Sequence, residues 1–197
     1  MKDFEIYYNN IRGIKSKWNS FMSIIEERKP DMIVLVETLL GEFENCEIEG
    51  YKTYRNNRNE NGGAGGVLIA VKEHLATITK KLTEIKGDLE SLWLVMDNGR
   101  HRIKIGGVYI PRENIGKSRL LEAFNNIEKG TEKDLVEGYQ TVVIGDTNAK
   151  MEDEGDSPGG KIQREMMERL SLTTMNMRDR CQGGQESKMI TNQEWTT

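Results

Sequence analysis

The sequence lacks the features that are typical of secreted proteins and of membrane proteins. Only two cysteines occur among its 197 residues, Cys46 and Cys181, and neither belongs to a Cys-x-x-Cys pair. This spacing argues against a disulfide framework or a zinc site and favours a reducing compartment. The first ten residues contain no apolar signal segment, and apolar runs such as VLIAV are far too short to span a membrane. We therefore expect an intracellular protein of the nucleus or cytoplasm, neither secreted nor membrane-bound.

A concentration of positive charge is also missing. The net charge is −4, the pI is about 5.4, and no basic run indicates a protein that coats nucleic acid through counterion release. An acidic chain can still cut nucleic acid if a metal ion and a few arginines face the phosphate. Charged residues make up 30% and aromatic residues 7%, which is typical of a folded globular chain. The length fits a single domain over residues 1–197.

Short apolar strands are interspersed with amphipathic helical patterns along the chain. We expect helices at residues 17–30, 118–129 and 161–172. We expect strands at residues 4–8, 31–37, 67–71, 76–82, 92–97, 102–110 and 141–144, with a more polar region around residues 51–55 before the third of them. Strands outnumber helices and several are consecutive, so the pattern predicts an α/β fold with mixed sheets covered by helices.

Four of the buried strands end in polar side chains. These side chains are Asn10, Glu37, Tyr109 and the pair Asp146 and Asn148. If the strand ends converge, their carboxylate, amide and phenol oxygens suit Mg²⁺, with Mn²⁺ as an alternative, and not zinc. A magnesium site of few ligands is the usual arrangement for phosphoryl chemistry. Taken singly, each residue also fits an ordinary turn or strand exit.

Five segments, in order, resemble the motifs of the endonuclease/exonuclease/phosphatase superfamily. They are YYNNIRGIKSKWNSF, PDMIVLVET, YRNNRNENGGAGGVLIAVK, VYIP and VVIGDTNAK. The residues of these segments are most similar to those of the apurinic/apyrimidinic-type endonuclease domains of non-LTR (LINE-type) retrotransposons. The resemblance runs from about residue 4 to the helix near residue 170. It implies a four-layer α/β sandwich of two mixed β-sheets flanked by helices, with the active site at one edge of the sheets.

The resemblance also implies a role for each polar strand end. Glu37 would bind the catalytic Mg²⁺, with Asn10 nearby in the shell of the metal. Asp146 would orient or deprotonate the attacking water. Asn148 would donate a hydrogen bond to the scissile phosphate, and Tyr109 would bond or position a phosphate oxygen. Neutral donors of this kind stabilise growing negative charge without a proton to lose.

The arginine-bearing loop and its glycines have two interpretations each. Arg55 and Arg58 match the superfamily loop that contacts the nucleic-acid backbone, although plain surface arginines are the alternative. The glycines of GGAGG precede a strand and no GK[ST] follows, so a nucleotide-binding loop is not expected. A turn that lets the backbone pass close to the substrate edge is the ordinary interpretation. The expected partner is a DNA substrate. The resemblance also implies that the chain is part of a longer polyprotein that contains a reverse transcriptase. The oligomeric state stays open.

The end of the family pattern is absent. Superfamily members carry a late Ser-Asp-His, whereas this chain has only His74 and His101, which lie too early and are expected on the surface. We therefore expect the C-terminal strands to be absent, as in a fragment or a degenerate copy. Their loss would leave an unpaired sheet edge, and the lost histidine would make activity weak or absent.

Three functions remain open from the sequence. The first is a Mg²⁺-dependent endonuclease that nicks DNA, as in retrotransposon target-site cleavage. The second is a phosphomonoesterase or phospholipase of the same superfamily, because fold and core residues do not fix the substrate. The third is a catalytically dead remnant that binds only metal or nucleic acid.

Overall fold

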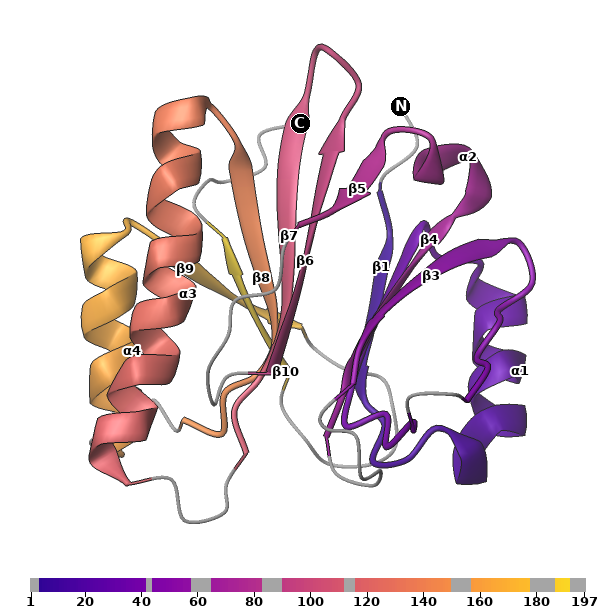
Figure 1. Ribbon diagram of the computed structural model, residues 1–197, viewed down its shortest axis with the longest axis horizontal. Coiled ribbons are helices and arrows are strands. Elements are labelled where there is room, and N and C mark those ends of the chain that lie inside the picture. Colours follow the sequence, from indigo (N-terminus) through magenta and orange to yellow (C-terminus); the bar gives the residue numbers. More distant parts are fainter. Residues whose placement is uncertain are drawn as a thin grey trace.

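Two β-sheets pack face to face and helices cover their outer faces, which makes four layers (Figure 1). The computed structural model describes residues 4–41, 44–57, 65–82, 90–111, 116–149, 157–177 and 187–191. This architecture confirms the α/β sandwich of two mixed sheets that the sequence predicts.

The first sheet has four strands in the order β1-β2-β4-β3. Its strands are β1 (Ile6–Asn10), β2 (Met32–Val36), β3 (Tyr51–Asn56) and β4 (Val67–Lys72). β1 and β2 are parallel, so both end at the same edge of the sheet, while β4 runs antiparallel to β2 and to β3. The 3-10 turn η1 (Lys15–Lys17) and helix α1 (Trp18–Arg28) follow β1, and α1 covers the outer face (Figure 1).

The second sheet has six strands in the order β5-β6-β7-β8-β10-β9. Its strands are β5 (Thr79–Lys81), β6 (Glu90–Asp97), β7 (Arg102–Tyr109), β8 (Gln140–Asp146), β9 (Thr173–Met177) and β10 (Ser187–Thr191). β7 and β8 are parallel, because helix α3 (Lys117–Glu137) carries the chain back between them. α3 and α4 (Pro158–Arg169) lie against the outer face, and the short α2 (Glu73–Ala76) links the two sheets. Within the described ranges, no helix is long and apolar enough to cross a membrane.

Side chains alternate along the central strands between two layers of core. On β2, Met32, Val34 and Val36 face the second sheet, whereas Ile33 and Leu35 pack toward α1. On β8, Val142 and Ile144 fill the inter-sheet layer and Val143 packs under α3 and α4. Both faces of these strands are buried, which explains why their sequences are continuous apolar runs. The sheets are therefore rigid supports for whatever their ends carry.

Several element boundaries differ from the sequence prediction. β1 ends at Asn10, so this residue belongs to the strand. The expected strand at 76–82 is wrong in its first part, because α2 ends at Ala76 and β5 begins only at Thr79. α3 continues well past residue 129. α4 begins at Pro158 because the Ser157 hydroxyl caps the Gly160 N–H at 3.0 Å, a start signal that outweighs the two glycines.

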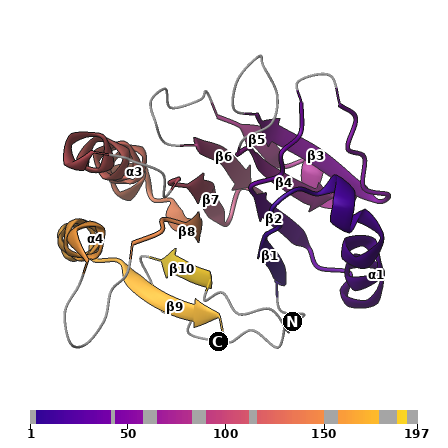
Figure 2. The ribbon, with the colours of Figure 1, turned by 90° about the horizontal axis from the view of Figure 1, so that it is seen from below.

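The edge beside β8 is paired, contrary to the sequence expectation. β10 runs antiparallel to β8, with Lys188 opposite Gly145 and Thr191 opposite Val142, and β9 pairs with β10 in turn. Figure 2 shows these two strands continuing the second sheet beyond β8. The sequence pattern predicts no strand after the last helix, so β9 and β10 are both additions to the predicted strands, and the segment at 187–191 mixes polar and apolar residues without alternation.

Candidate active site

Four strand ends meet at one edge of the sandwich. β1 and β2 end in register, with Asn10 opposite Val36, and Glu37 follows directly. In the second sheet β7 and β8 also end in register, with Tyr109 opposite Asp146. The carboxyl ends of the two parallel pairs therefore bring together the polar residues that the sequence places at strand ends.

The side-chain amide of Asn10 joins the two sheets. Its Nδ2 donates to Glu37 Oε1 at 2.7 Å and to Asp146 Oδ2 at 3.1 Å. The Oδ1 atom of Asn10 is buried and has no hydrogen-bond partner among the described residues. Two carboxylates thus lie around one amide group, with an unused carbonyl oxygen beside them.

Local backbone contacts fix the direction of Asp146. Its Oδ1 accepts the Asn148 N–H at 2.9 Å, and its carbonyl accepts the Ile110 N–H at 2.9 Å. Gly145 precedes it because a Cβ at that position would lie 1.8 Å from the carbonyl oxygen of Val108. The close approach of β7 and β8 therefore requires the glycine of the GD pair.

Glu37 begins a turn that is held on both sides. Its φ of +54° is left-handed, a conformation that a non-glycine residue keeps only when its surroundings enforce it. Its carbonyl accepts the Gly13 N–H at 2.8 Å, and the next carbonyl, of Thr38, accepts the Ile14 N–H at 3.1 Å. The loop after β1 therefore fixes the turn that carries the Glu37 carboxylate.

Two buried phenols line the inter-sheet side of the cluster. The Tyr109 hydroxyl donates to Glu37, and burial together with this bond raises the pKa of Tyr109 well above its usual range. Burial and the charges of Asp146 and Glu37 likewise raise the pKa of Tyr8. The Tyr8 hydroxyl is buried and has no hydrogen-bond partner in the described part of the chain. Both hydroxyls therefore remain protonated donors at neutral pH.

Asn148 lies next to Asp146 but is partly engaged by the backbone. Its Nδ2 donates to the carbonyl of Ile110 at 2.7 Å, and its φ is +50°. This bond ties the turn after β8 to the exit of β7, so Asn148 supports the site as well as lining it.

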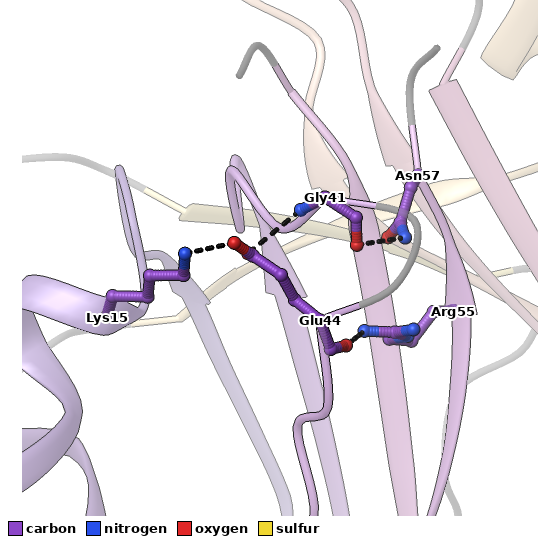
Figure 3. A network of polar contacts seen from close by, with 5 residues as sticks. All are labelled: Lys15, Gly41, Glu44, Arg55 and Asn57. Carbon is purple, nitrogen blue, oxygen red and sulfur yellow. Dashed lines mark hydrogen bonds and ion pairs between the residues drawn. The ribbon is translucent and has the colours of Figure 1, made fainter. Parts of the chain in front are cut away.

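Arg55 does not join the cluster. It lies on β3 opposite Leu68, whose side chain packs toward α1, and its guanidinium donates to the carbonyl of Glu44. Figure 3 shows this bond within a network in which the Glu44 carboxylate accepts from Lys15 and from the Gly41 N–H. Arg55 therefore holds the loop after Glu37. Arg58 lies outside the described residues.

The two histidines lie at the far end of the sandwich. His74 follows β4, whose last residues pair with the beginning of β2, whereas Glu37 follows the end of β2. His101 lies in the turn before β7, whose opposite end is Tyr109. Both are exposed, as the sequence predicts, and neither reaches the cluster.

The sequence prediction missed three residues that support the site. Tyr8 carries no signal of its own in the sequence, because an aromatic residue on a strand is typical of the core. Gln163 is fully buried on α4 and accepts the Thr147 hydroxyl at 2.7 Å, which fixes the residue between Asp146 and Asn148. Glu90 is buried at the start of β6, opposite Tyr109. A glutamate at a strand start and a glutamine in an amphipathic helix carry no distinctive sequence signal.

The cluster offers oxygen donors for a hard cation. They are the carboxylates of Glu37 and Asp146 and the buried Oδ1 of Asn10. Within the described ranges no three Asp, Glu, His or Cys side chains converge, so an amide would have to be the third donor. One or two carboxylates completed by water and substrate suffice for Mg²⁺.

Several solved structures share the fold. AP endonuclease LMAP from Leishmania major has a TM-score of 0.73 at 15% identity, over 95% of this chain and 78% of that chain. A 3′ phosphatase from Neisseria, solved with a product DNA hairpin, has a TM-score of 0.70 at 11% identity, over 96% and 86%. The endonuclease domain of TRAS1, a telomere-specific non-LTR retrotransposon, has a TM-score of 0.67 at 14% identity, over 95% and 83%.

The family assignment rests on the sequence match. No curated protein sequence matches this chain. The model of the Endonuclease/Exonuclease/phosphatase family matches residues 10–196, which include all four strand ends of the cluster. The chain therefore belongs to the endonuclease/exonuclease/phosphatase family, whose members are hydrolytic nucleases and phosphatases.

Proposed function

We propose that this chain is a metal-dependent phosphodiesterase, an endonuclease that nicks DNA as in retrotransposon target-site cleavage. The observation that carries the proposal is the position of the Asn10 amide between the carboxylates of Glu37 and Asp146. Two carboxylates at one edge of the sandwich, with no basic side chain among their hydrogen-bond donors in the described residues, favour a bound cation.

The donor set fits Mg²⁺, with Mn²⁺ as the alternative. The buried Oδ1 of Asn10 lacks a partner among the described residues, and a cation held by Glu37 and Asn10 would satisfy it. Among the described residues the cluster contains no thiol or imidazole, which argues against zinc. When bound, the metal would neutralise the phosphate oxygens and assist departure of the leaving 3′ oxygen.

Asp146 is suited to accept the proton of the attacking water. The Asn148 N–H and the Asn10 amide hold its two oxygens in a fixed direction without protonating them. Its Oδ2, which accepts from the same Asn10 amide that bonds Glu37, would take the proton. Prepositioned bases of this kind accelerate hydrolysis by about 10² to 10⁴-fold.

Tyr109 and Asn148 are suited to bind the phosphate. The raised pKa keeps the Tyr109 hydroxyl protonated, so it can donate to a non-bridging oxygen without losing a proton. The Asn148 amide donates to the Ile110 carbonyl at 2.7 Å, and we propose that it turns part of this donation to a phosphate oxygen when substrate binds. Arg55 and Arg58 stay as proposed backbone contacts, although Arg55 would have to exchange its bond to Glu44.

DNA is the proposed substrate class. The similar structures include an AP endonuclease and a retrotransposon endonuclease domain. The residues of the five sequence motifs favour the retrotransposon type of endonuclease. They therefore also favour a polyprotein that carries a reverse transcriptase. His74 and His101 are the two histidines of the chain, and both lie at the opposite end of the sandwich from the cluster. The cluster therefore lacks the histidine of the family pattern, and we expect slow hydrolysis.

Phosphomonoester hydrolysis is the second candidate. The roles proposed for the cluster of Asn10, Glu37 and Asp146 involve only metal and phosphate, and a 3′ phosphatase from Neisseria shares the fold. The same carboxylates would serve a terminal phosphate as well as an internal one.

A supercoiled-plasmid nicking assay with Mg²⁺ tests the proposal. Asp146→Asn removes the proton acceptor, and Glu26→Gln, at an exposed carboxylate of α1, is the matched control. We expect nicking that EDTA abolishes, that Asp146→Asn lowers by about 10³-fold or more, and that Glu26→Gln leaves unchanged.

A second substrate separates the two candidates. Release of phosphate from a 3′-phosphorylated oligonucleotide by a folded sample that does not nick plasmid would favour the phosphomonoesterase. A folded sample that attacks neither substrate contradicts both.

A further inference from the structure

The turn Gly65–Gly66 connects Glu90 in the second sheet to the turn after Glu37 in the first. The Gly66 N–H donates to Glu90 Oε2 at 2.5 Å. On the other side of the turn, the Gly66 carbonyl accepts the Thr38 N–H at 3.3 Å, and the Gly65 carbonyl accepts the Leu39 N–H at 2.9 Å. We call Glu90, Gly65 and Gly66 the cross-sheet clasp.

The two glycines are required by what surrounds them. Their φ angles are +77° at Gly65 and +93° at Gly66, which side chains rarely adopt. A Cβ at Gly65 would lie 2.1 Å from Glu90 Oε2, and a Cβ at Gly66 would lie 2.6 Å from Thr38 Oγ1. The carboxylate and the hydroxyl thus occupy the space of the missing side chains, which explains the end of the GGAGG motif.

Glu90 is held in the same place from its own strand. It is 8% exposed, it is the first residue of β6, and it pairs with Tyr109 across the ladder. The Asn56 side chain donates to the carbonyl of Ser91 at 2.8 Å, which fixes the start of β6 to the first sheet. Burying a carboxylate is costly, and an apolar residue there would cost less. A role in positioning accounts for keeping the glutamate.

We propose that Glu90 is a positioning residue, which holds the glycine turn so that the left-handed turn at Glu37 directs its carboxylate into the site. The clasp lies beside the bond from Tyr109 to Glu37, so two connections between the sheets flank the same carboxylate. The functional part of this inference rests on the proposed role of Glu37, whereas the clasp itself does not.

Three variants distinguish the effect of the length of the Glu90 side chain from the effect of its charge. Glu90→Gln keeps the length of the side chain and an oxygen for the Gly66 N–H but loses the charge. Glu90→Asp keeps the charge but is one methylene shorter and withdraws from Gly66. Ser91→Ala is the matched control, because the Ser91 hydroxyl is buried and makes no hydrogen bond in the described part of the chain.

Two readouts are measured on the full chain. Amide hydrogen exchange of Thr38 and Leu39 reports the clasp with no metal present. Titration with Mn²⁺ reports the Glu37 carboxylate. For Glu90→Asp we expect exchange of both amides to rise about ten-fold and Mn²⁺ affinity to fall about ten-fold, the usual effect of losing a partner that orients a ligand. Glu90→Gln and Ser91→Ala are expected within about two-fold of wild type in both readouts.

The outcomes are distinguishable. Unchanged exchange in Glu90→Asp overturns the clasp. Faster exchange with unchanged Mn²⁺ affinity overturns the positioning of Glu37. Impairment in Glu90→Gln but not in Glu90→Asp would mean that Glu90 acts through its charge, which also contradicts the proposal. A wild-type chain that binds no Mn²⁺ contradicts the proposed function. In that case the hydrogen exchange of Thr38 and Leu39 still decides whether the clasp exists.

Discussion

The side-chain amide of Asn10 lies 3.1 Å from the carboxylate of Asp146, although 136 positions separate them in the sequence. One residue ends the first strand of the first sheet, and the other ends a central strand of the second. The same amide also reaches Glu37, so the carboxylates of both sheets meet at one group. The four-layer sandwich therefore builds the site by stacking two parallel strand pairs with their carboxyl ends at one edge.

The side-chain amide of Asn10, which donates two hydrogen bonds, is expected to stabilise the fold. Asn10→Ala removes two hydrogen bonds to charged groups and leaves the carboxylates of Glu37 and Asp146 without their shared donor. We predict a loss of about 2 kcal/mol in the free energy of unfolding at neutral pH, measured by urea denaturation. Asn9→Ala is the matched control, because Asn9 bonds the Tyr7 hydroxyl at 3.0 Å on the other face of β1. Equal losses of unfolding free energy in the two variants would contradict a special role for the hydrogen bonds from Asn10 to Glu37 and Asp146.

The Tyr8 hydroxyl is expected to contribute nothing to stability. It is buried and lacks a hydrogen-bond partner among the described residues, so Tyr8→Phe removes an unsatisfied group without leaving another. We predict that Tyr8→Phe leaves the free energy of unfolding unchanged or raises it by about 1 kcal/mol. Tyr109→Phe breaks the bond to Glu37 and should lower it by about 1 to 2 kcal/mol. A destabilised Tyr8→Phe variant would show that this hydroxyl has a structural partner.

Alkaline pH is expected to destabilise the protein through the same two tyrosines. Their pKa values are raised in the folded state, so above about pH 10 the unfolded chain loses protons that the folded chain keeps. Below about pH 10 the two ionisations do not change the stability, and above it each lowers the free energy of unfolding by at most about 1.4 kcal/mol per pH unit. Urea midpoints between about pH 9 and pH 11 should fall less steeply in Tyr109→Phe than in wild type. Identical slopes in the two proteins would refute this assignment.

Gly145 is expected to be indispensable for the fold. In Gly145→Ala the added methyl group meets the carbonyl of Val108, so β7 and β8 must separate beneath Tyr109 and Asp146. We predict a loss of at least about 3 kcal/mol, seen as a lower thermal midpoint or as insoluble protein. Gly116→Ala serves as the control, because a Cβ there meets nothing within 4 Å and its φ is not left-handed. Comparable stability of the two variants would contradict the close approach of these strands.

The sequence places Asn10, Glu37, Tyr109 and Asp146 each at the end of a buried strand. That these ends meet follows only from the parallel pairing of β1 with β2 and of β7 with β8, which the sequence does not specify. The roles of these residues in catalysis stay predictions. The sheet pairing of β10 could not be predicted, since its five residues carry no periodic pattern and their conformation depends on pairing with β8, a strand distant in the sequence.

Two other features depend on contacts that sequence alone does not specify. The glycines of GGAGG predict a turn, but their partner Glu90 lies in the other sheet and looks like an ordinary surface glutamate at a strand start. Arg55 fits the arginine-bearing loop of the family, yet its guanidinium bonds a carbonyl of the neighbouring loop (Figure 3). In both cases long-range packing decides what a short motif does.

The most direct test of the account is a Mn²⁺ titration followed by electron paramagnetic resonance, on wild type, Glu37→Gln and Glu26→Gln. The account predicts one saturable site in wild type and in Glu26→Gln, and its loss in Glu37→Gln with the fold retained. Binding that is equal in all three proteins, or absent from folded wild type, would contradict the assignment of a metal to the cluster of Asn10, Glu37 and Asp146.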